Sequence, residues 1–204
     1  SLDSIEARLV EQRYGWDSFE LTRARFASDH AAVIEQIHAG ADRTEELAAA
    51  ALTGGDSALV TVELRAIRSG TGETAESFEQ MLTIIARLAH PRDGIFAELD
   101  AVGDDLEDLT ASTGSAELLG ELAAMRNLER TLTSTGSAED LADLQNAAQA
   151  YLDTLDGTPG LAGYAGDAAP LVSRYLEHAS EVSRLLTSLN DTFFTAQNRK
   201  ASLR

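Results

Sequence analysis

Apolar side chains recur every three to four residues along almost the whole chain, which is the spacing of one face of an α-helix. The longest stripe occupies the first 51 residues and keeps the coiled-coil period of 3.5 residues. No proline interrupts it, so it predicts one helix over residues 2–51, about 75 Å long. Its positions are Ile5, Leu9, Gln12, Trp16, Phe19, Arg23, Phe26, His30, Val33, Ile37, Gly40, Thr44, Leu47 and Ala51.

Five further helices are predicted, at residues 57–68, 73–90, 93–133, 138–156 and about 170–200, with a glycine-rich loop at 157–167. Ser69-Gly70-Thr71-Gly72 is expected to separate the second helix from the third. Ser112-Thr113-Gly114-Ser115 either breaks or kinks the fourth helix, and one long helix is favoured. The segment Ser-Thr-Gly-Ser-Ala-Glu at 134–139 is expected to end that helix, with Gly136 as its C-cap and Ser137 as the next N-cap.

These lengths predict an all-α fold of six helices, two long and four short, that form two stacked four-helix bundles sharing the first and fourth helices. The chain is then a single domain, 1–204, with two modules. One module comprises about 1–25 plus 115–204, and the other about 26–114. Both chain ends meet at one end of the stack, which suits a domain inserted between two membrane spans.

Composition narrows the possible partners. The chain has 204 residues, a hydrophobic fraction of 44% and aromatics at 5%, which suits narrow helix–helix packing. Its formal net charge of −18 argues against nucleic acid and against anionic membrane surfaces, both of which require clustered basic residues. The absence of cysteine excludes disulfides and thiolate chemistry. The longest clean apolar run, Leu47–Leu52, is too short to span a bilayer, and the start at Ser1 suggests a fragment of a longer protein.

The predicted order of helices resembles the helical bimodular sensor domain of bacterial transmembrane receptors, which include chemoreceptors and sensor histidine kinases. The segment Leu122–Arg130, the Thr135-Gly136 turn and the helix that carries Tyr151 resemble one part of that family, and Leu171–Leu186 resembles its closing helix. Lysine is common in the family where Arg130 follows Glu129, and simpler CHASE-type four-helix sensors share similar segments.

The resemblance implies a periplasmic or extracellular domain of an inner-membrane protein, with flanking transmembrane helices in the parent protein. It also implies a homodimer in the full receptor, a small organic acid as ligand, and a kinase or chemotaxis output carried by another part of that protein. The fragment itself is expected not to be an enzyme.

Polar residues on the apolar stripes are the first candidate ligand site. Arg23 and His30 interrupt the first stripe, while His178 lies beside Tyr175 on the last helix. Counting residues from the shared end places His30 and His178 at nearly one height on antiparallel helices. Arginine binds a carboxylate with two parallel hydrogen bonds, so this group would suit an organic acid. The alternative is a partly solvated polar layer that fixes the register of the helices.

Arg126 and Arg130 are one helical turn apart and form the second candidate ligand site. The alternative is that they pair at the surface with Glu129, Glu121 or Asp17. A third arginine pair, Arg65 and Arg68, has Glu63, Asp42 and Glu76 available as acidic partners.

No catalytic, metal or cofactor site is predicted. The chain lacks the Gly-x-Ser-x-Gly, phosphate-loop and Rossmann motifs. The Glu35-x-x-His38 spacing occurs only once, whereas a di-iron bundle requires two such motifs. The leading hypothesis is therefore an extracytoplasmic ligand-sensing domain that binds a small organic acid. The alternative is a structural or protein–protein interaction rod without a small-molecule ligand.

Overall fold

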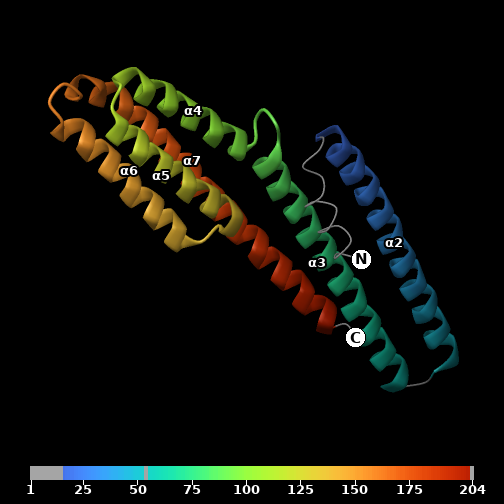
Figure 1. The fold of residues 1–204 in the computed structure, drawn as a ribbon. Helices are drawn as coiled ribbons and strands as arrows, with labels where there is room; N and C mark the ends of the chain where they lie inside the picture. The colour runs from blue at the N-terminus through green and yellow to red at the C-terminus, as the bar shows by residue number, and fades with distance from the viewer. Residues whose placement is uncertain (1–15, 53–54, 203–204) are drawn as a thin grey trace. The chain divides into compact units, whose positions relative to one another are not determined.

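The computed structural model describes residues 16–52 and 55–202, and every regular element within those ranges is an α-helix. The helices are α2 (Trp16–Ala51), α3 (Gly55–Ala89), α4 (Ile95–Thr113), α5 (Ala116–Thr135), α6 (Ala138–Gly157) and α7 (Ala162–Ser202) (Figure 1). The predictions of an all-helical chain and of six helices are therefore confirmed for the described part.

The division into two long and four short helices is wrong. Helices α2, α3 and α7 have 36, 35 and 41 residues, whereas α4, α5 and α6 have 19, 20 and 20. The difference arises because the predicted helices at 57–68 and 73–90 are one helix, and because the predicted helix at 93–133 is two. The first part of the predicted helix 2–51, residues 2–15, lies outside the described residues.

The chain divides into two compact units. One contains the described residues up to Thr83 together with those from Thr192 onward, and the other contains Ile84–Asp191. The boundaries fall inside α3 and α7, so each of these two continuous helices contributes residues to both units.

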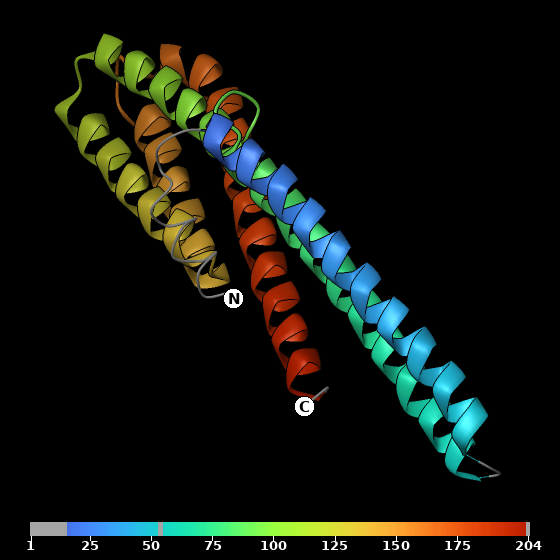
Figure 2. The same ribbon diagram turned by 90° about the vertical axis from the view of Figure 1, so that its right-hand side faces the viewer.

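The core of the 84–191 unit is enclosed by α4, α5, α6 and the portion of α7 up to Asp191, and the end of α3 adds Ile84 and Leu88 (Figures 1 and 2). Two-residue connections join α4 to α5 and α5 to α6, so successive helices run in opposite directions. The core is mainly leucine with two tyrosines. Its fully buried side chains include Leu99, Leu106, Leu118, Met125, Leu132, Leu144, Tyr151, Leu155, Tyr175 and Val182.

Two identical segments make the corners at either end of α5. Ser-Thr-Gly-Ser-Ala-Glu occurs at 112–117 and again at 134–139. In both, the glycine is left-handed, with φ of 65° at Gly114 and 67° at Gly136. The following serine caps the next helix, because Ser115 accepts from the Leu118 N–H and Ser137 from the Asp140 N–H. The cap at Gly136–Ser137 is as predicted, whereas the helix predicted to run unbroken through Gly114 is corrected.

Helix α3 continues through Ser69-Gly70-Thr71-Gly72, where a break was predicted. Two glycines in a helix cost about 1 kcal/mol each relative to alanine. The Thr71 hydroxyl donates to the carbonyls of Ile67 and Arg68, so its hydrogen bonds are made within the helix. His38 Nε2 lies 3.2 Å from Thr71 Oγ1, so α2 also holds this segment.

Helices α2 and α3 form an antiparallel hairpin and lie side by side in both views (Figures 1 and 2). The hairpin does not use the predicted stripe of α2, because Val33, Ile37 and Leu47 are exposed. The stripe that packs lies one residue further along the helix. Its buried or half-buried positions are Ile34, His38, Ala41, Glu45 and Ala48. The period of 3.5 residues is confirmed in this region, and the phase is wrong.

The chemistry of the two helices explains this phase. Ala41 and Ala48 are small, so the helix axes can approach closely. The polar members of the packed stripe have partners on α3, because Arg68 donates to Glu45 at 3.0 Å and also binds Asp42. Val33, Ile37 and Leu47 are consequently directed away from the hairpin's own seam.

Helix α7 begins at Ala162, although residues 157–167 were predicted to be a loop and the helix to start near Pro170. Pro170 lies inside the helix and has no N–H, so one backbone hydrogen bond is missing there. The remaining connection from α6 is short and contains Gly160, whose φ of 96° favours glycine.

Candidate functional site

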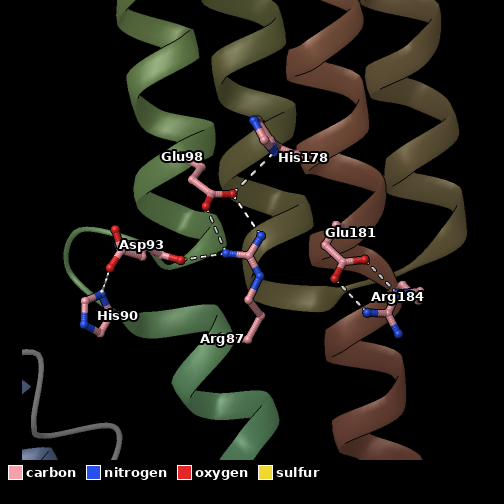
Figure 3. A network of polar contacts seen from close by, with 7 residues as sticks. All are labelled: Arg87, His90, Asp93, Glu98, His178, Glu181 and Arg184. Atoms are coloured by element: carbon pink, nitrogen blue, oxygen red, sulfur yellow. Dashed lines mark hydrogen bonds and ion pairs between the residues drawn. The ribbon is translucent and has the colours of Figure 1, made fainter.

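The 84–191 unit contains two networks of charged side chains, and the first joins the end of α3, the start of α4 and α7 (Figure 3). Arg87 donates a hydrogen bond from each of its two terminal nitrogens to the Glu98 carboxylate, both at 3.0 Å. Arg87 also donates to the Asp93 carbonyl at 2.6 Å. On the other side of Glu98, His178 Nδ1 lies 3.7 Å from the carboxylate. Glu98 therefore connects a cation on α3 with an imidazole on α7.

The turn between α3 and α4 places these groups. His90 Nδ1 accepts the N–H of Arg92 at 3.3 Å and that of Asp93 at 3.0 Å, so the imidazole holds the turn closed. A Cβ at Gly94 would lie 2.3 Å from the His90 carbonyl oxygen, so only glycine fits there. The turn directs Arg87 and Glu98 toward each other across eleven residues of chain.

A surface groove of about 370 Å³ opens beside this network. It combines three groups that can carry positive charge, Arg87, His178 and Arg184, with the carboxylates of Glu177 and Glu181. Ile95 and Ser180 complete its lining. In a chain of net charge −18, a groove with balanced charge is a place where an anion meets less repulsion than elsewhere.

The cations of the groove are paired with glutamates. Arg184 donates to both oxygens of Glu181 at 2.7 Å. These hydrogen bonds lower the pKa of Glu181, and the hydrogen bonds from Arg87 lower the pKa of Glu98. A bound anion would therefore exchange with a glutamate at an arginine rather than fill an empty position.

We expect the stability of the protein to fall in acid partly through Glu98. Its pKa in the folded protein lies below the ordinary value of 4.5, so the unfolded chain binds this proton more readily. The contribution of Glu98 is fully present above pH 4.5 and is lost as the pH falls through its folded pKa. Urea unfolding between about pH 7 and about pH 3 should show a shallower loss of stability in Glu98→Gln than in the wild type.

Glu177→Gln is the control for this prediction, because it removes an exposed carboxyl from the same groove. Because Glu177 is exposed, this variant should change the slope of stability against pH less than Glu98→Gln does. An identical slope in the wild type and Glu98→Gln would contradict the role given to the Arg87–Glu98 pair.

The second network surrounds Arg126 on α5. Its guanidinium donates to Asp100 at 2.7 Å and to Glu129 at 2.7 Å. Two further carboxylates lie close, with Asp104 at 3.6 Å and Glu107 at 3.3 Å. Burial by itself would lower the pKa of Arg126, but the hydrogen bond to Asp100 and the charge of Glu129 outweigh it and raise the pKa.

Gly103 on α4 makes room for this guanidinium. A Cβ on Gly103 would lie 2.0 Å from Arg126 Nη1, so Arg126 packs directly on the backbone of α4. Asp100, Asp104 and Glu107 lie on the same side of α4, at helical spacing around this contact. The arginine therefore attaches α5 to α4 with its charge already compensated.

The network extends into the core through Glu129 and Tyr175. Glu129 is 8% exposed, and its carboxylate accepts hydrogen bonds from Arg126 and from the Tyr175 hydroxyl. Burial and the neighbouring negative charge of Glu129 raise the pKa of the Tyr175 phenol. Tyr175 is thus a neutral donor that satisfies a buried carboxylate between α7 and α5.

A second groove, of about 490 Å³, lies between α4 and α5. Arg126 and Arg130 both contribute to it, together with Glu107, Asp108 and Asn127. Arg130 is exposed and donates to the Asn127 side chain at 3.0 Å. In this groove a carboxylate ligand would meet Arg126, which already binds other carboxylates, and the exposed Arg130. It would also meet the acidic side chains of Glu107 and Asp108.

The structure separates the residues predicted to form ligand sites. His178 lines the first groove, while Tyr175, three residues earlier, lies in the core and is joined to Arg126 through Glu129. Arg126 and Arg130 line the second groove together, as their spacing predicts. The surface pairing of Arg126 with Glu129 that was weighed as an alternative is present, although Glu129 is buried. Arg23 and His30 belong to α2, and their side chains lie outside the described residues.

Sequence reasoning missed Arg87, Glu98 and Arg184. Arg87 ends an apolar helix and Glu98 opens the next one after a His-Pro-x-Asp-Gly turn, which is the signal that could have paired them. Glu129 was considered only as a surface partner, although it continues the apolar positions Leu122 and Met125 at helical spacing.

Searches for similar proteins found no matching family model, no matching curated protein and no matching solved structure. Within residues 16–52 and 55–202, no group of three or more histidine or acidic side chains is arranged to hold a metal ion. None of the helices in these ranges combines the length and the hydropathy needed to cross a bilayer.

Proposed function

We propose that this chain is a ligand-sensing domain of a bacterial transmembrane signalling receptor, either a chemoreceptor or a sensor histidine kinase, and that its ligand is a small organic carboxylate. The observation that carries the proposal is the groove in which Arg87, His178 and Arg184 face one space of about 370 Å³. Such a volume accommodates a small organic acid.

A ligand carboxylate would bind in the groove by replacing a glutamate as the partner of an arginine. Arg184 is exposed, so releasing Glu181 to water and accepting a ligand carboxylate costs little desolvation. Arginine can grip the ligand with two parallel hydrogen bonds, and a protonated His178 would add a second cation. Glu177 and Glu181 would repel ligands with several negative charges, so monocarboxylates and dicarboxylates are favoured over tricarboxylates.

Signal transfer in this proposal uses α7. The groove residues from Glu177 to Arg184 lie on α7, which continues without interruption to Ser202. A ligand that binds one arrangement of α3, α4 and α7 better than another shifts the population toward that arrangement. The proposal also includes a periplasmic or extracellular location, flanking membrane helices, and an arrangement of two stacked bundles.

Titration calorimetry with acetate, succinate and benzoate tests the ligand class and the groove together. We expect saturable binding of at least one of these acids, and an affinity about tenfold or more weaker in His178→Ala and in Arg184→Ala, which corresponds to ~1.4 kcal/mol. Arg174→Ala is the matched control, because it removes an exposed α7 arginine that does not line the groove. No binding of any acid, or unchanged affinity in both groove variants, would reject the site.

One further variant distinguishes this groove from the site predicted from sequence at Arg23, His30, Tyr175 and His178. Arg23→Ala should leave the affinity unchanged if the ligand occupies the groove of Arg87 and Arg184. A loss of affinity in Arg23→Ala with normal binding in Arg184→Ala would favour the predicted site instead. Arg130→Ala tests the second groove in the same titration.

The second candidate function is a structural or protein–protein interaction rod. The observation that favours it is the set of exposed apolar side chains on the α2–α3 hairpin, which includes Val33, Ile37 and Leu47. This function does not depend on the groove, and a chain that binds no carboxylate but associates through the hairpin would have this role.

A further inference from the structure

One side of helix α2 is free of charge over five turns. Its positions, each three or four residues apart, are Val33, Ile37, Gly40, Thr44, Leu47 and Ala51, and all of them are exposed. Val33, Ile37 and Leu47 are 52%, 36% and 63% exposed. A quarter of the chain is charged, yet none of these six positions is. This stripe is therefore an apolar surface rather than an ordinary solvated helix face.

Helix α3 widens the surface. The contacts of His38 with Thr71 and of Arg68 with Asp42 fix the antiparallel register of the hairpin. Residues that flank the seam of one helix adjoin the matching residues of its partner. Ile67, which is exposed beside the seam residue Arg68, therefore adjoins Thr44. The uncharged face of the hairpin, defined by the six α2 positions together with Val60, Ile67, Gly70 and Thr74, spans both helices.

Charge is sorted to the other side of the hairpin. Asp42 flanks the opposite edge of the seam, where it binds the seam residue Arg68. Two carboxylates, Asp56 and Glu63, stand at the α3 margin of the uncharged face. A basic partner would be attracted to the acidic surfaces of this chain and would gain nothing here. Two copies that each carry −18 repel, so they can approach closely only where the charge is absent.

The stripe is also arranged to match itself. If two α2 helices run antiparallel about a twofold axis midway between Gly40 and Thr44, Ile37 of one copy opposes Leu47 of the other. Gly40 then opposes Thr44, and the space above Gly40 is open, because nothing lies within 4 Å of a Cβ placed there. A twofold interface requires this kind of self-complementarity.

We propose that the uncharged face of the α2–α3 hairpin is a self-association surface through which two copies of this chain pair, hairpin against hairpin. The seam inside one hairpin is thin, with Ala41, Ala48 and Leu64 as its buried apolar side chains among the described residues 31–52 and 56–71. Pairing two hairpins adds a second apolar layer and forms a four-helix arrangement, the usual way in which helices bury two stripes.

The area of the uncharged face determines how tightly two copies are expected to associate. Residues 33–51 extend ~27 Å, and two helices side by side are ~20 Å wide, so each copy contributes about 540 Å². The total, about 1,100 Å², is near the lower limit for specific association. The dimer should therefore dissociate in the micromolar range rather than be permanent.

Sedimentation velocity from about 1 µM to several hundred µM tests the proposal, since a micromolar dimer dissociates within this range. The wild type should shift from monomer to dimer, and Ile37→Glu and Leu47→Glu should each weaken association about tenfold or more, because each places like charges in the interface. Leu59→Glu and Val62→Glu are matched controls. These two α3 residues are 62% and 58% exposed but lie outside the uncharged face, and their variants should stay within about twofold of the wild type.

Cross-linking gives a second readout that requires no loss of affinity. The chain has no cysteine, so Thr44→Cys introduces the only thiol, near the proposed twofold axis. A short bismaleimide should join two Thr44→Cys copies much faster than two Leu59→Cys copies. A wild type that remains monomeric throughout, an unchanged dimer in Ile37→Glu and Leu47→Glu, or equal cross-linking at both positions would overturn the proposal.

Discussion

Replacing Arg126 with methionine should lower the free energy of unfolding by about 3–5 kcal/mol at neutral pH, because it leaves the buried Glu129 carboxylate without a counter-charge. Tyr175 can still donate to Glu129, but a hydrogen bond from a neutral phenol does not replace a cation. Asp100 and its acidic neighbours on α4 also lose the charge that offsets their mutual repulsion. In thermal unfolding followed by circular dichroism, the midpoint should drop by roughly 10 °C.

Arg130→Met is the matched control, because Arg130 lies one turn further along α5, is exposed and donates to Asn127. It should change stability by less than about 0.5 kcal/mol. The double variant Arg126→Met, Glu129→Gln should recover part of the loss, since it removes the buried charge that Arg126 had compensated. Equal effects of Arg126→Met and Arg130→Met would show that the buried position of Glu129 is wrong.

Gly136→Ala should lower the free energy of unfolding by about 3–4 kcal/mol, because two unfavourable effects combine at this corner. The left-handed backbone disfavours any side chain by about 1–2 kcal/mol. The new Cβ would also lie 2.5 Å from the Cβ of Leu186, an atom fixed to the α7 backbone that cannot rotate away. Separating the corner from α7 would strain the buried hydrogen bond from the Ser183 hydroxyl to the Gly136 carbonyl, now 2.8 Å long.

Gly114→Ala separates these penalties, because Gly114 has nearly the same φ in an identical six-residue segment and has nothing within 4 Å of its added Cβ. This variant should lower the free energy of unfolding by only about 1–2 kcal/mol, which is the penalty of the left-handed backbone alone. Chemical unfolding of the two variants measures the difference. If Gly114→Ala is as damaging as Gly136→Ala, the contact between the second corner and Leu186 is not what limits that position.

The repeated segment also shows where sequence reasoning was inconsistent. Ser-Thr-Gly-Ser-Ala-Glu was interpreted as a helix end at 134–139 and as the interior of a helix at 112–117, although the local signals are identical. A glycine at the left-handed position followed by a serine N-cap ends a helix in both places. The local capping chemistry at Gly114 and Ser115 was therefore a better guide than the choice of one long helix.

The stripe on α2 shows a limit of a different kind. Periodicity establishes that a helix has an apolar side, and it identified the helix correctly over the described part of residues 16–51. It does not tell which of two adjacent stripes faces the neighbouring helix. That choice depended on partners in α3, where Thr71 and Arg68 meet His38 and Glu45, and such pairs appear only when both helices are placed.

Candidate site residues were found where charge interrupts an apolar pattern, as at His178 and Arg126. Glu129 was weighed in advance as a partner of Arg126. The partners Glu98 and Asp100 could not be foreseen, because the turns at Gly94 and at Gly114–Ser115 bring them to His178 and Arg126. Arg126 and Arg130 look alike in sequence, yet one is held by four carboxylates and the other is exposed. Burial of Glu129 determines this difference, and burial is a property of the assembled core.

The division of the chain into two units also orders its folding. The 84–191 unit is built from consecutive residues joined by short turns, so its native contacts are local and it can form rapidly on its own segment. The other unit draws on residues up to Thr83 and again from Thr192 onward, and its two parts close a loop of 108 intervening residues. During synthesis the hairpin of α2 and α3 emerges before the 84–191 unit but cannot complete its own unit until the end of α7 has been made. The apolar side chains of that hairpin are consequently exposed on the growing chain before those of the 84–191 unit, and they are among the last to gain their full set of neighbours.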